Sequence, residues 1–394
     1  MVLYFVLLSA FATFAVQIGL YLIIMMKRKL FLLLPLLFAF VDGVAQTTQK
    51  AQIQRIRELY AEAKKMVAAN GKEGKAPHDM TIELNDGTQV DEDFIINEES
   101  ELMFYFKKKN EPESYIVDPT SVCYFMTENF EAHGHTHYRE WLFDPEKEHL
   151  LFVFTRNETD AGYVMESRFY FDEKGKLIEK KYKAGGKDVD EDDEEYDGKS
   201  ELEQAKKYKE IFDLMVNNED VKDANRLKFK DVKTAAKADR LKMIRSTYAD
   251  AKERVAKNDK SELPRDMRIV LHDQLAEDYP PVTLDLKFFF EPITKGESYE
   301  NTCYFISKQH SSMYFKEYSE FLLEPKMHKL IFSFTQALEE GETYEWRYYY
   351  DENGKCIDTK VKSVDEEDNG DSGVGDKESF GKYMRVFNLV ANGD

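Results

Sequence analysis

Three histidines at alternate positions form the segment of the sequence best suited to metal chemistry. His133, His135 and His137 are separated from one another by single residues. In an extended strand, alternate residues share a face about 7 Å apart, so two neighbouring imidazoles can share one zinc, copper or nickel ion. The favoured interpretation is a solvent-exposed hairpin rich in histidine. A metal site at His133, His135 and His137 is the alternative.

An acidic loop near the carboxyl terminus is a second candidate for metal binding. Asp365, Asn369, Asp371 and Asp376 provide side-chain oxygen atoms at spacings related to those of calcium-binding loops. Asp376 stands where such a loop normally has a bidentate glutamate, and the segment follows a predicted strand instead of a helix. The alternative to a calcium site is a solvated run of charge.

The sequence contains three cysteines, too few for a disulfide scaffold. Cys123 and Cys303 lie in apolar segments, where we expect small buried core residues. The alternative for Cys303 is a disulfide with Cys356.

Carboxylates and arginines also occur at equivalent places in the two halves of the chain. We predict a buried ion pair in each half, with a structural role, from the residues Glu140, Glu166, Arg168, Glu320, Glu345 and Arg347. The motifs of serine hydrolases, P-loop proteins, dinucleotide-binding enzymes and zinc proteases do not occur in the sequence. These observations favour a non-enzymatic protein.

An internal duplication is the strongest pattern in the sequence. The segment from Ile56 to Lys64 recurs from Ile244 to Lys252, and Cys123-Tyr124-Phe125 recurs as Cys303-Tyr304-Phe305. Further matches follow in the same order, up to a tyrosine, phenylalanine, leucine and asparagine pattern that ends at Asn217 and again at Asn392. Matches in conserved order indicate a tandem duplication.

Each repeat shows the same succession of structural signals. An amphipathic helix comes first, followed by segments of alternating apolar residues such as Leu150-x-Phe152-x-Phe154, and a closing helix comes last. We therefore predict an α+β fold of two tandem homologous domains. Each would contain an N-terminal helix, a curved antiparallel β-meander and a C-terminal helix. The first repeat is predicted over 46–217, a linker over 218–232 and the second repeat over 233–394.

The amino terminus is strongly apolar up to about residue 41. Lys27-Arg28-Lys29, an apolar run of about a dozen residues and Gly43-Val44-Ala45 match the parts of a secretory signal peptide, which we predict over 26–45. The apolar segment 1–25 is then either upstream reading frame or a membrane anchor. We expect the protein to be exported and to be periplasmic, cell-surface or secreted.

Composition restricts the partners of the protein. The chain has 394 residues with 75 acidic and 55 basic side chains, a net charge of −20. Such an excess argues against binding to nucleic acid or to anionic lipid, which leaves an N-terminal segment as the only expected membrane contact. Aromatic-rich strands suit packing of both sheet faces, or a platform for a sugar or a peptide.

These patterns together predict an exported binding or scaffold protein without enzymatic activity, whose partner is a protein or a glycan. A metal-binding protein or metal-dependent enzyme that uses the three histidines is the alternative. The predicted arrangement of a helix on a curved sheet is similar to cystatin-like folds. That similarity implies, as a second alternative, an inhibitor of an extracellular hydrolase.

Overall fold

The computed structural model consists of two units, Met1–Leu59 and Tyr60–Asp394. It describes residues 49–72, 76–89, 95–109, 120–132, 135–159, 161–189, 198–217, 234–274, 281–295, 298–313, 315–324, 329–339, 341–362 and 373–393. In the first unit, residues 49–59 are helical, and in the second unit residues 60–69 are helical. All further description concerns the second unit.

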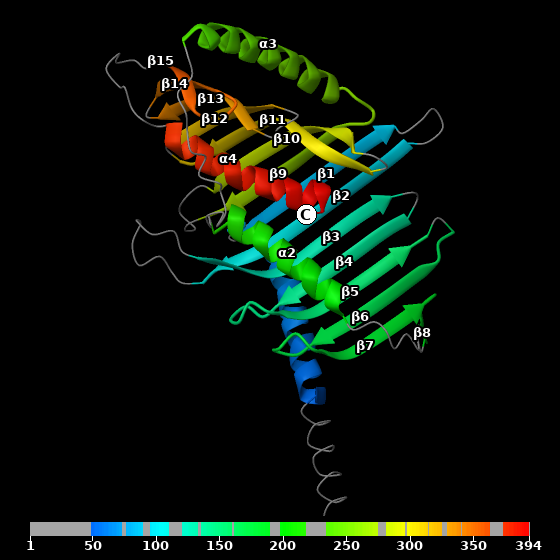
Figure 1. Ribbon diagram of the computed structural model, residues 1–394. Helices are drawn as coiled ribbons and strands as arrows, with labels where there is room; N and C mark the ends of the chain where they lie inside the picture. Colours follow the sequence, from blue (N-terminus) through cyan, green and yellow to red (C-terminus); the bar gives the residue numbers. More distant parts are fainter. Residues whose placement is uncertain are drawn as a thin grey trace, which may run out of the picture. The chain divides into compact units, whose positions relative to one another are not determined.

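The strands of both repeats belong to a single antiparallel sheet of 15 strands (Figure 1). Those of the first repeat are β1 (Asp79–Gln89), β2 (Ile95–Lys108), β3 (Ser121–Ala132), β4 (His135–Phe143), β5 (Leu150–Glu158), β6 (Val164–Phe171), β7 (Leu177–Ala184) and β8 (Lys187–Val189). Those of the second repeat are β9 (Arg265–Asp273), β10 (Val282–Lys295), β11 (Ser298–Ser311), β12 (Phe315–Glu324), β13 (Lys329–Glu339), β14 (Glu342–Tyr350) and β15 (Cys356–Lys362). Their order across the sheet is β15 to β9, followed by β1 to β8.

The prediction of two tandem α+β domains is therefore wrong. Strand β1 pairs with β9 in an antiparallel register, so the sheet runs without a break from one repeat into the other. The physical reason is that β1 and β9 would each be an open edge of a separate sheet, with a row of unpaired N–H and C=O groups. Pairing the two edges satisfies both rows. The boundaries at 46–217, 218–232 and 233–394 stay predictions.

The junction between the repeats has local two-fold symmetry. Ile82 pairs directly with Ile269, which is its own equivalent in the second repeat. Two residues to either side of this pair, Met80 pairs with Leu271 and Leu84 pairs with Met267. Both isoleucines are almost completely buried, with 1% and 0% of their surface exposed. At the centre of the sheet, two equivalent strands therefore pair with each other through their apolar residues.

Helices α2 (Lys199–Met215) and α4 (Gly373–Phe387) pack on the same face of the sheet, which we call the α2/α4 face (Figure 1). Phe212 of α2 stacks on Phe104 with ring centroids 6.2 Å apart, and Phe387 of α4 stacks on Phe288 at 5.9 Å. A short π-helical turn, η1 (Asn388–Asn392), follows α4. One continuous hydrophobic core covers this face across both repeats.

Helix α3 (Thr234–Asn258) packs on the opposite face, which we call the α3 face. Its buried residues Ile244 and Ala251 belong to a second core with Phe289, Phe305 and Phe332. Consecutive residues of a strand point to opposite faces, so Phe289 is buried in the core under α3 while Phe288 and Phe290 are buried in the core of the α2/α4 face. The aromatic runs seen in the sequence therefore fill two cores.

Asparagine side chains attach the ends of the closing helices to the sheet in the same way in both repeats. Asn217 accepts a hydrogen bond from the backbone N–H of Ser121 at 2.8 Å and donates one to its carbonyl at 3.1 Å. Asn392 makes the same two bonds to Asn301, at 2.8 and 3.0 Å. Each amide thus acts as one more residue in the hydrogen-bond ladder of a strand.

The predicted export segments, 1–25 and 26–45, lie outside the described residues. Within the described part of the chain, no helix combines the length and apolar character needed to cross a bilayer.

Candidate functional site

A buried glutamate is the centre of a polar cluster in the first repeat. Glu140 on β4 exposes 3% of its surface, yet both of its oxygen atoms are occupied. Oε1 accepts hydrogen bonds from Lys64 at 2.7 Å and from Tyr138 at 2.5 Å. Oε2 accepts a hydrogen bond from Tyr60. Tyr60 and Lys64 are four residues apart on one helix, which places them on the same face of it.

The second repeat contains the same cluster around Glu320 on β12, which is also 3% exposed. Its Oε1 accepts hydrogen bonds from Lys252 at 2.6 Å and from Tyr318 at 2.5 Å, and its Oε2 accepts one from Tyr248. In both clusters, burial and the bonded carboxylate raise the pKa of the tyrosine hydroxyls. The tyrosines therefore stay protonated near neutral pH and serve as hydrogen-bond donors. This chemistry suits the attachment of a helix to the sheet.

Of the predicted ion pairs, those between the arginines and Glu166 or Glu345 form, in half-buried positions, whereas the buried Glu140 and Glu320 have lysines as their cationic partners. Arg168 pairs with Glu166 at 3.1 Å, and Arg347 pairs with Glu345 at 3.3 Å. The lysine on the helix is the cation that meets the buried glutamate in each repeat. The signal that could have shown this is the tyrosine and lysine four residues apart, which recurs in both repeats.

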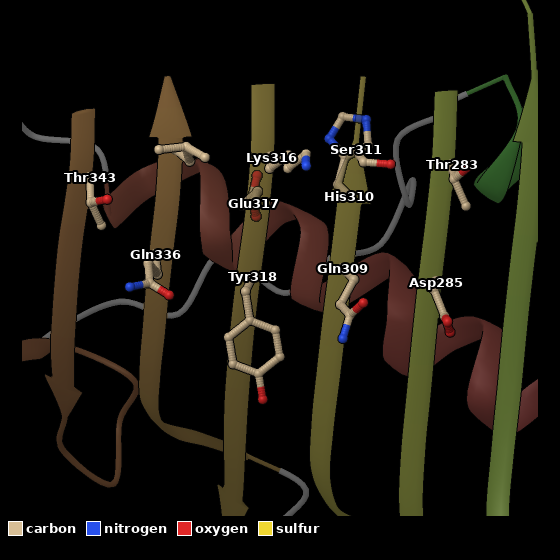
Figure 2. Close-up of a pocket in the computed structure, with 11 residues that line it drawn as sticks. Thr283, Asp285, Gln309, His310, Ser311, Lys316, Glu317, Tyr318, Gln336 and Thr343 are labelled. Carbon is tan, nitrogen blue, oxygen red and sulfur yellow. The ribbon is translucent and has the colours of Figure 1, made fainter. Parts of the chain in front are cut away.

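A groove of about 560 Å³ lies on the second repeat (Figure 2). Asp285, Gln309, Tyr318 and Gln336 pair with one another across β10, β11, β12 and β13, so they form a row perpendicular to the strands. The ring of Tyr318 lies between the two glutamines of this row (Figure 2). Asp285 and Phe289 lie an even number of residues apart on β10, as do Gln309 and Phe305 on β11, so each pair shares one face of its strand. Both phenylalanines belong to the core under α3, which places the row on the α3 face.

A second row of lining residues follows two positions farther along the same strands. It consists of Thr283, Ser311, Lys316, Leu338 and Thr343, which also pair from strand to strand across β10 to β14. His310 and Glu317 also border the groove, but they lie between residues of these rows, so their side chains point to the α2/α4 face. We call this site the second-repeat groove. Its floor is a patch of side chains two residues deep along the strands and four to five strands wide.

Most polar side chains of the two rows have hydrogen-bonding capacity to spare. Among the described residues, no side-chain hydrogen bond or ion pair involves Thr283, Gln309, Ser311, Lys316, Gln336 or Thr343. Leu338 adds an apolar side chain that is 40% exposed. The groove thus combines unoccupied donors and acceptors with an aromatic ring and an aliphatic side chain, as small-ligand sites do.

Most charges of the groove are already neutralised. Asp285 accepts two hydrogen bonds from Arg268, at 3.1 and 2.7 Å, and on the other face of β11 and β12 Glu317 pairs with Lys308 at 2.6 Å. Burial and the neighbouring Lys308 lower the pKa of His310, so its imidazole is neutral near pH 7. Lys316 therefore provides the unbalanced charge of the lining, in a chain whose net charge is −20.

The first repeat has the same two rows but a different lining. Glu101, Asn129, Tyr138 and Arg156 are the counterparts of the first row. Their polar groups are occupied, because Asn129 donates to Glu101 at 3.3 Å and Arg156 donates to Glu158 at 2.9 Å. Glu99, Glu131, Thr136, Glu158 and Val164 form the counterpart of the second row. Tyr138, like Tyr318 in the second repeat, is the shared residue of an otherwise diverged surface.

The structure brings two of the three candidate histidines close together. His135 and His137 lie on β4 with ring centroids 6.5 Å apart, whereas His133 lies outside the described residues. Nδ1 of His137 is 2.9 Å from Oδ1 of Asn157 and is engaged there in a hydrogen bond. In the described part of the chain, no group of three potential metal ligands is found. The metal site at these histidines stays a prediction.

The calcium candidate cannot be placed, since Asp365, Asn369 and Asp371 lie outside the described residues. Asp376 belongs to α4. All three cysteines are free thiols, and Cys303 is buried whereas Cys356 is exposed. Burial raises the pKa of the Cys303 thiol, so it remains an unreactive core group.

Two histidine–aspartate pairs lie at one end of the strand pair that joins the repeats. Nδ1 of His78 is 2.9 Å from Oδ1 of Asp273, and Nδ1 of His272 is 2.9 Å from Oδ1 of Asp79. Lys108 donates a second charged hydrogen bond to Asp273. Burial acts to raise the pKa of Asp273, but the hydrogen bonds from His78 and Lys108 outweigh it and hold the pKa below its usual range.

Asp273→Asn is expected to make the protein less stable at neutral pH, by about 1–3 kcal/mol, because the half-buried acceptor of the bonds from His78 and Lys108 loses its negative charge and one of its two acceptor oxygens. A carboxyl group with a lowered folded-state pKa stabilises the fold above its unfolded pKa of about 3.9 and loses that effect as the pH falls through the folded value. The difference from wild type should therefore shrink on acidification. Urea unfolding from neutral to acidic pH measures it. Asp250→Asn, at a 67% exposed side chain, is the control.

A scan against protein-family models found no match to this chain, and neither did searches of curated proteins and of solved structures. The assignment of function therefore depends on the geometry of the groove.

Proposed function

We propose that this chain is an exported, non-enzymatic binding protein whose ligand lies in the second-repeat groove. The observation that carries the proposal is the set of uncommitted polar side chains around Tyr318. A protein surface normally satisfies its polar groups with water, and a ligand gains specificity by replacing that water with matched donors and acceptors. Gln309 and Gln336 offer such groups on both sides of one aromatic ring.

The contrast between the repeats supports the same conclusion. In both copies, Tyr138 or Tyr318 bonds to the buried glutamate, which is a role in the fold. The residues around this tyrosine differ between the repeats. Arg156 and Glu158 are hydrogen-bonded to each other in the first repeat, whereas their counterparts Gln336 and Leu338 make no such bond. Packing alone does not account for this difference, because both surfaces lie on equally regular strands.

The expected result is that a ligand of the wild-type protein loses at least tenfold in affinity when the groove lining is removed. The test variant is Gln309→Ala combined with Lys316→Ala and Gln336→Ala. The matched control carries Asn129→Ala, Thr136→Ala and Arg156→Ala, the equivalent positions of the first repeat. Isothermal titration against a mixed panel of soluble oligosaccharides and peptides measures the affinities.

Two results would contradict the proposal. One is a panel in which no compound binds the wild-type protein. The other is a compound that binds wild type and groove variant with equal affinity, since its site would then lie elsewhere. A circular dichroism melt of each variant verifies that the fold is retained.

A further inference from the structure

We infer that the ligand of the second-repeat groove is a linear oligosaccharide that lies across strands β10 to β14. This inference rests on the function proposed above and adds the chemical class of the ligand. It follows from three properties of the groove: the spacing of its polar groups, the kind of hydrogen bonds they make, and the position of its apolar surfaces.

The spacing of the polar groups is set by the sheet. Neighbouring strands lie about 4.8 Å apart, so the row from Thr283 to Thr343 across five strands repeats at that interval over roughly 19 Å. The parallel row of Gln309 and Gln336 lies about 7 Å away along the strands. A ligand that meets both rows is therefore a narrow, extended polymer. A peptide strand presents same-face side chains about 6.7 Å apart, which does not match the interval between strands.

The chemistry of the groups favours hydroxyl partners. The carboxamides of Gln309 and Gln336 donate and accept, and the hydroxyls of Thr283, Ser311 and Thr343 do the same. A sugar hydroxyl also donates and accepts, so any orientation of these side chains finds a complementary group. A peptide backbone instead presents separate donors and acceptors, whose usual partner in a sheet protein is a free strand edge.

The apolar surfaces of the groove suit the C–H faces of pyranose rings. Tyr318 lies in the middle of the first row (Figure 2), where a sugar ring can stack on the aromatic face. Leu338, 40% exposed, lies between Lys316 and Thr343 in the second row. The unbalanced Lys316 then predicts tighter binding of oligosaccharides that carry a carboxylate.

The test uses the purified protein with three sets of probes: neutral linear hexasaccharides, linear hexasaccharides that contain uronate, and uncharged extended peptides of similar length. We expect binding of at least one hexasaccharide. Gln309→Ala with Gln336→Ala should weaken it at least tenfold, whereas the control Asn129→Ala with Arg156→Ala should leave it unchanged. Lys316→Gln should weaken binding of the uronate set by a larger factor than binding of the neutral set.

The outcomes separate this inference from the proposed function. If peptides bind, hexasaccharides do not, and the Gln309 and Gln336 variant loses the peptides, then the groove is a binding site and the oligosaccharide inference is wrong. If hexasaccharides bind equally to wild type and to the groove variant, both the inference and the location of the site are wrong. Tyr318 is left unchanged in every variant because its hydroxyl also holds Glu320.

Discussion

Phe212→Ala is expected to lower the free energy of unfolding by about 3–5 kcal/mol and to shift the unfolding of the whole sheet, in one transition. Phe212 is 1% exposed and contacts the rings of Phe104 and Phe106, at centroid distances of 6.2 and 5.6 Å. Its removal leaves a cavity in a core that continues under α4 into the second repeat. Because that core is continuous, a loss in one repeat weakens the other.

Differential scanning calorimetry measures this effect, together with urea unfolding followed by tryptophan fluorescence. Trp141 lies in the first repeat and Trp346 in the second, so the fluorescence reports on both. Phe387→Ala, the equivalent change in α4, should have the same consequence, and Met243→Ala, at a 40% exposed side chain, should have little. Two separated transitions, with only the first repeat affected by Phe212→Ala, would show that the repeats unfold independently.

Glu140→Gln is expected to cost about 2–4 kcal/mol, and Glu320→Gln about the same. The glutamine side chain has nearly the volume of glutamate, so the loss measures hydrogen bonding and charge instead of packing. Its amide nitrogen is a donor placed among donors, since Lys64, Tyr60 and Tyr138 all direct a proton at the carboxylate. At least one donor of the cluster is then left without an acceptor in a buried site.

Lys64→Ala is the informative control for this change. The lysine side chain is 43% exposed, so its ammonium group reaches water, and its loss should cost under about 1 kcal/mol. Urea denaturation of the three single variants at neutral pH compares these costs. Equal stability of wild type and Glu140→Gln would mean that the cluster does not anchor the helix.

The strands could be predicted from sequence because the pattern that specifies them is local. Leu150, Phe152 and Phe154 alternate with other residues, and a pleated strand turns alternate residues to one side wherever it lies. The union of β1 with β9 could not be predicted in this way. Met80 and Ile82 give β1 the same apolar pattern whether its edge pairs with β9 of the second repeat or stays unpaired, so the pattern does not predict the pairing.

The groove was missed for a related reason. Its lining combines two short runs, 309–311 and 316–318, with separate residues of β10, β13 and β14 that are distant in the sequence. A usable signal does exist in the repeat itself. Gln309 and Gln336 differ from Asn129 and Arg156, the residues at the equivalent positions of the first repeat, although the buried residues of these strands are similar in both repeats. A surface that differs between two copies with the same core is a candidate for a function found in one copy.

The pairing of Ile82 with Ile269 has a consequence for the time at which the protein can fold. The two residues are 187 positions apart, so β1 remains an open edge until the chain has been synthesised as far as β9, the first strand of the second repeat. At about 5–20 residues per second, that interval is roughly 10–40 s. During this time a nascent first repeat presents an apolar edge strand that fits an identical strand of a neighbouring chain as well as its own β9. The rate of folding and the resistance to aggregation therefore depend on how quickly β9 is synthesised and pairs with β1.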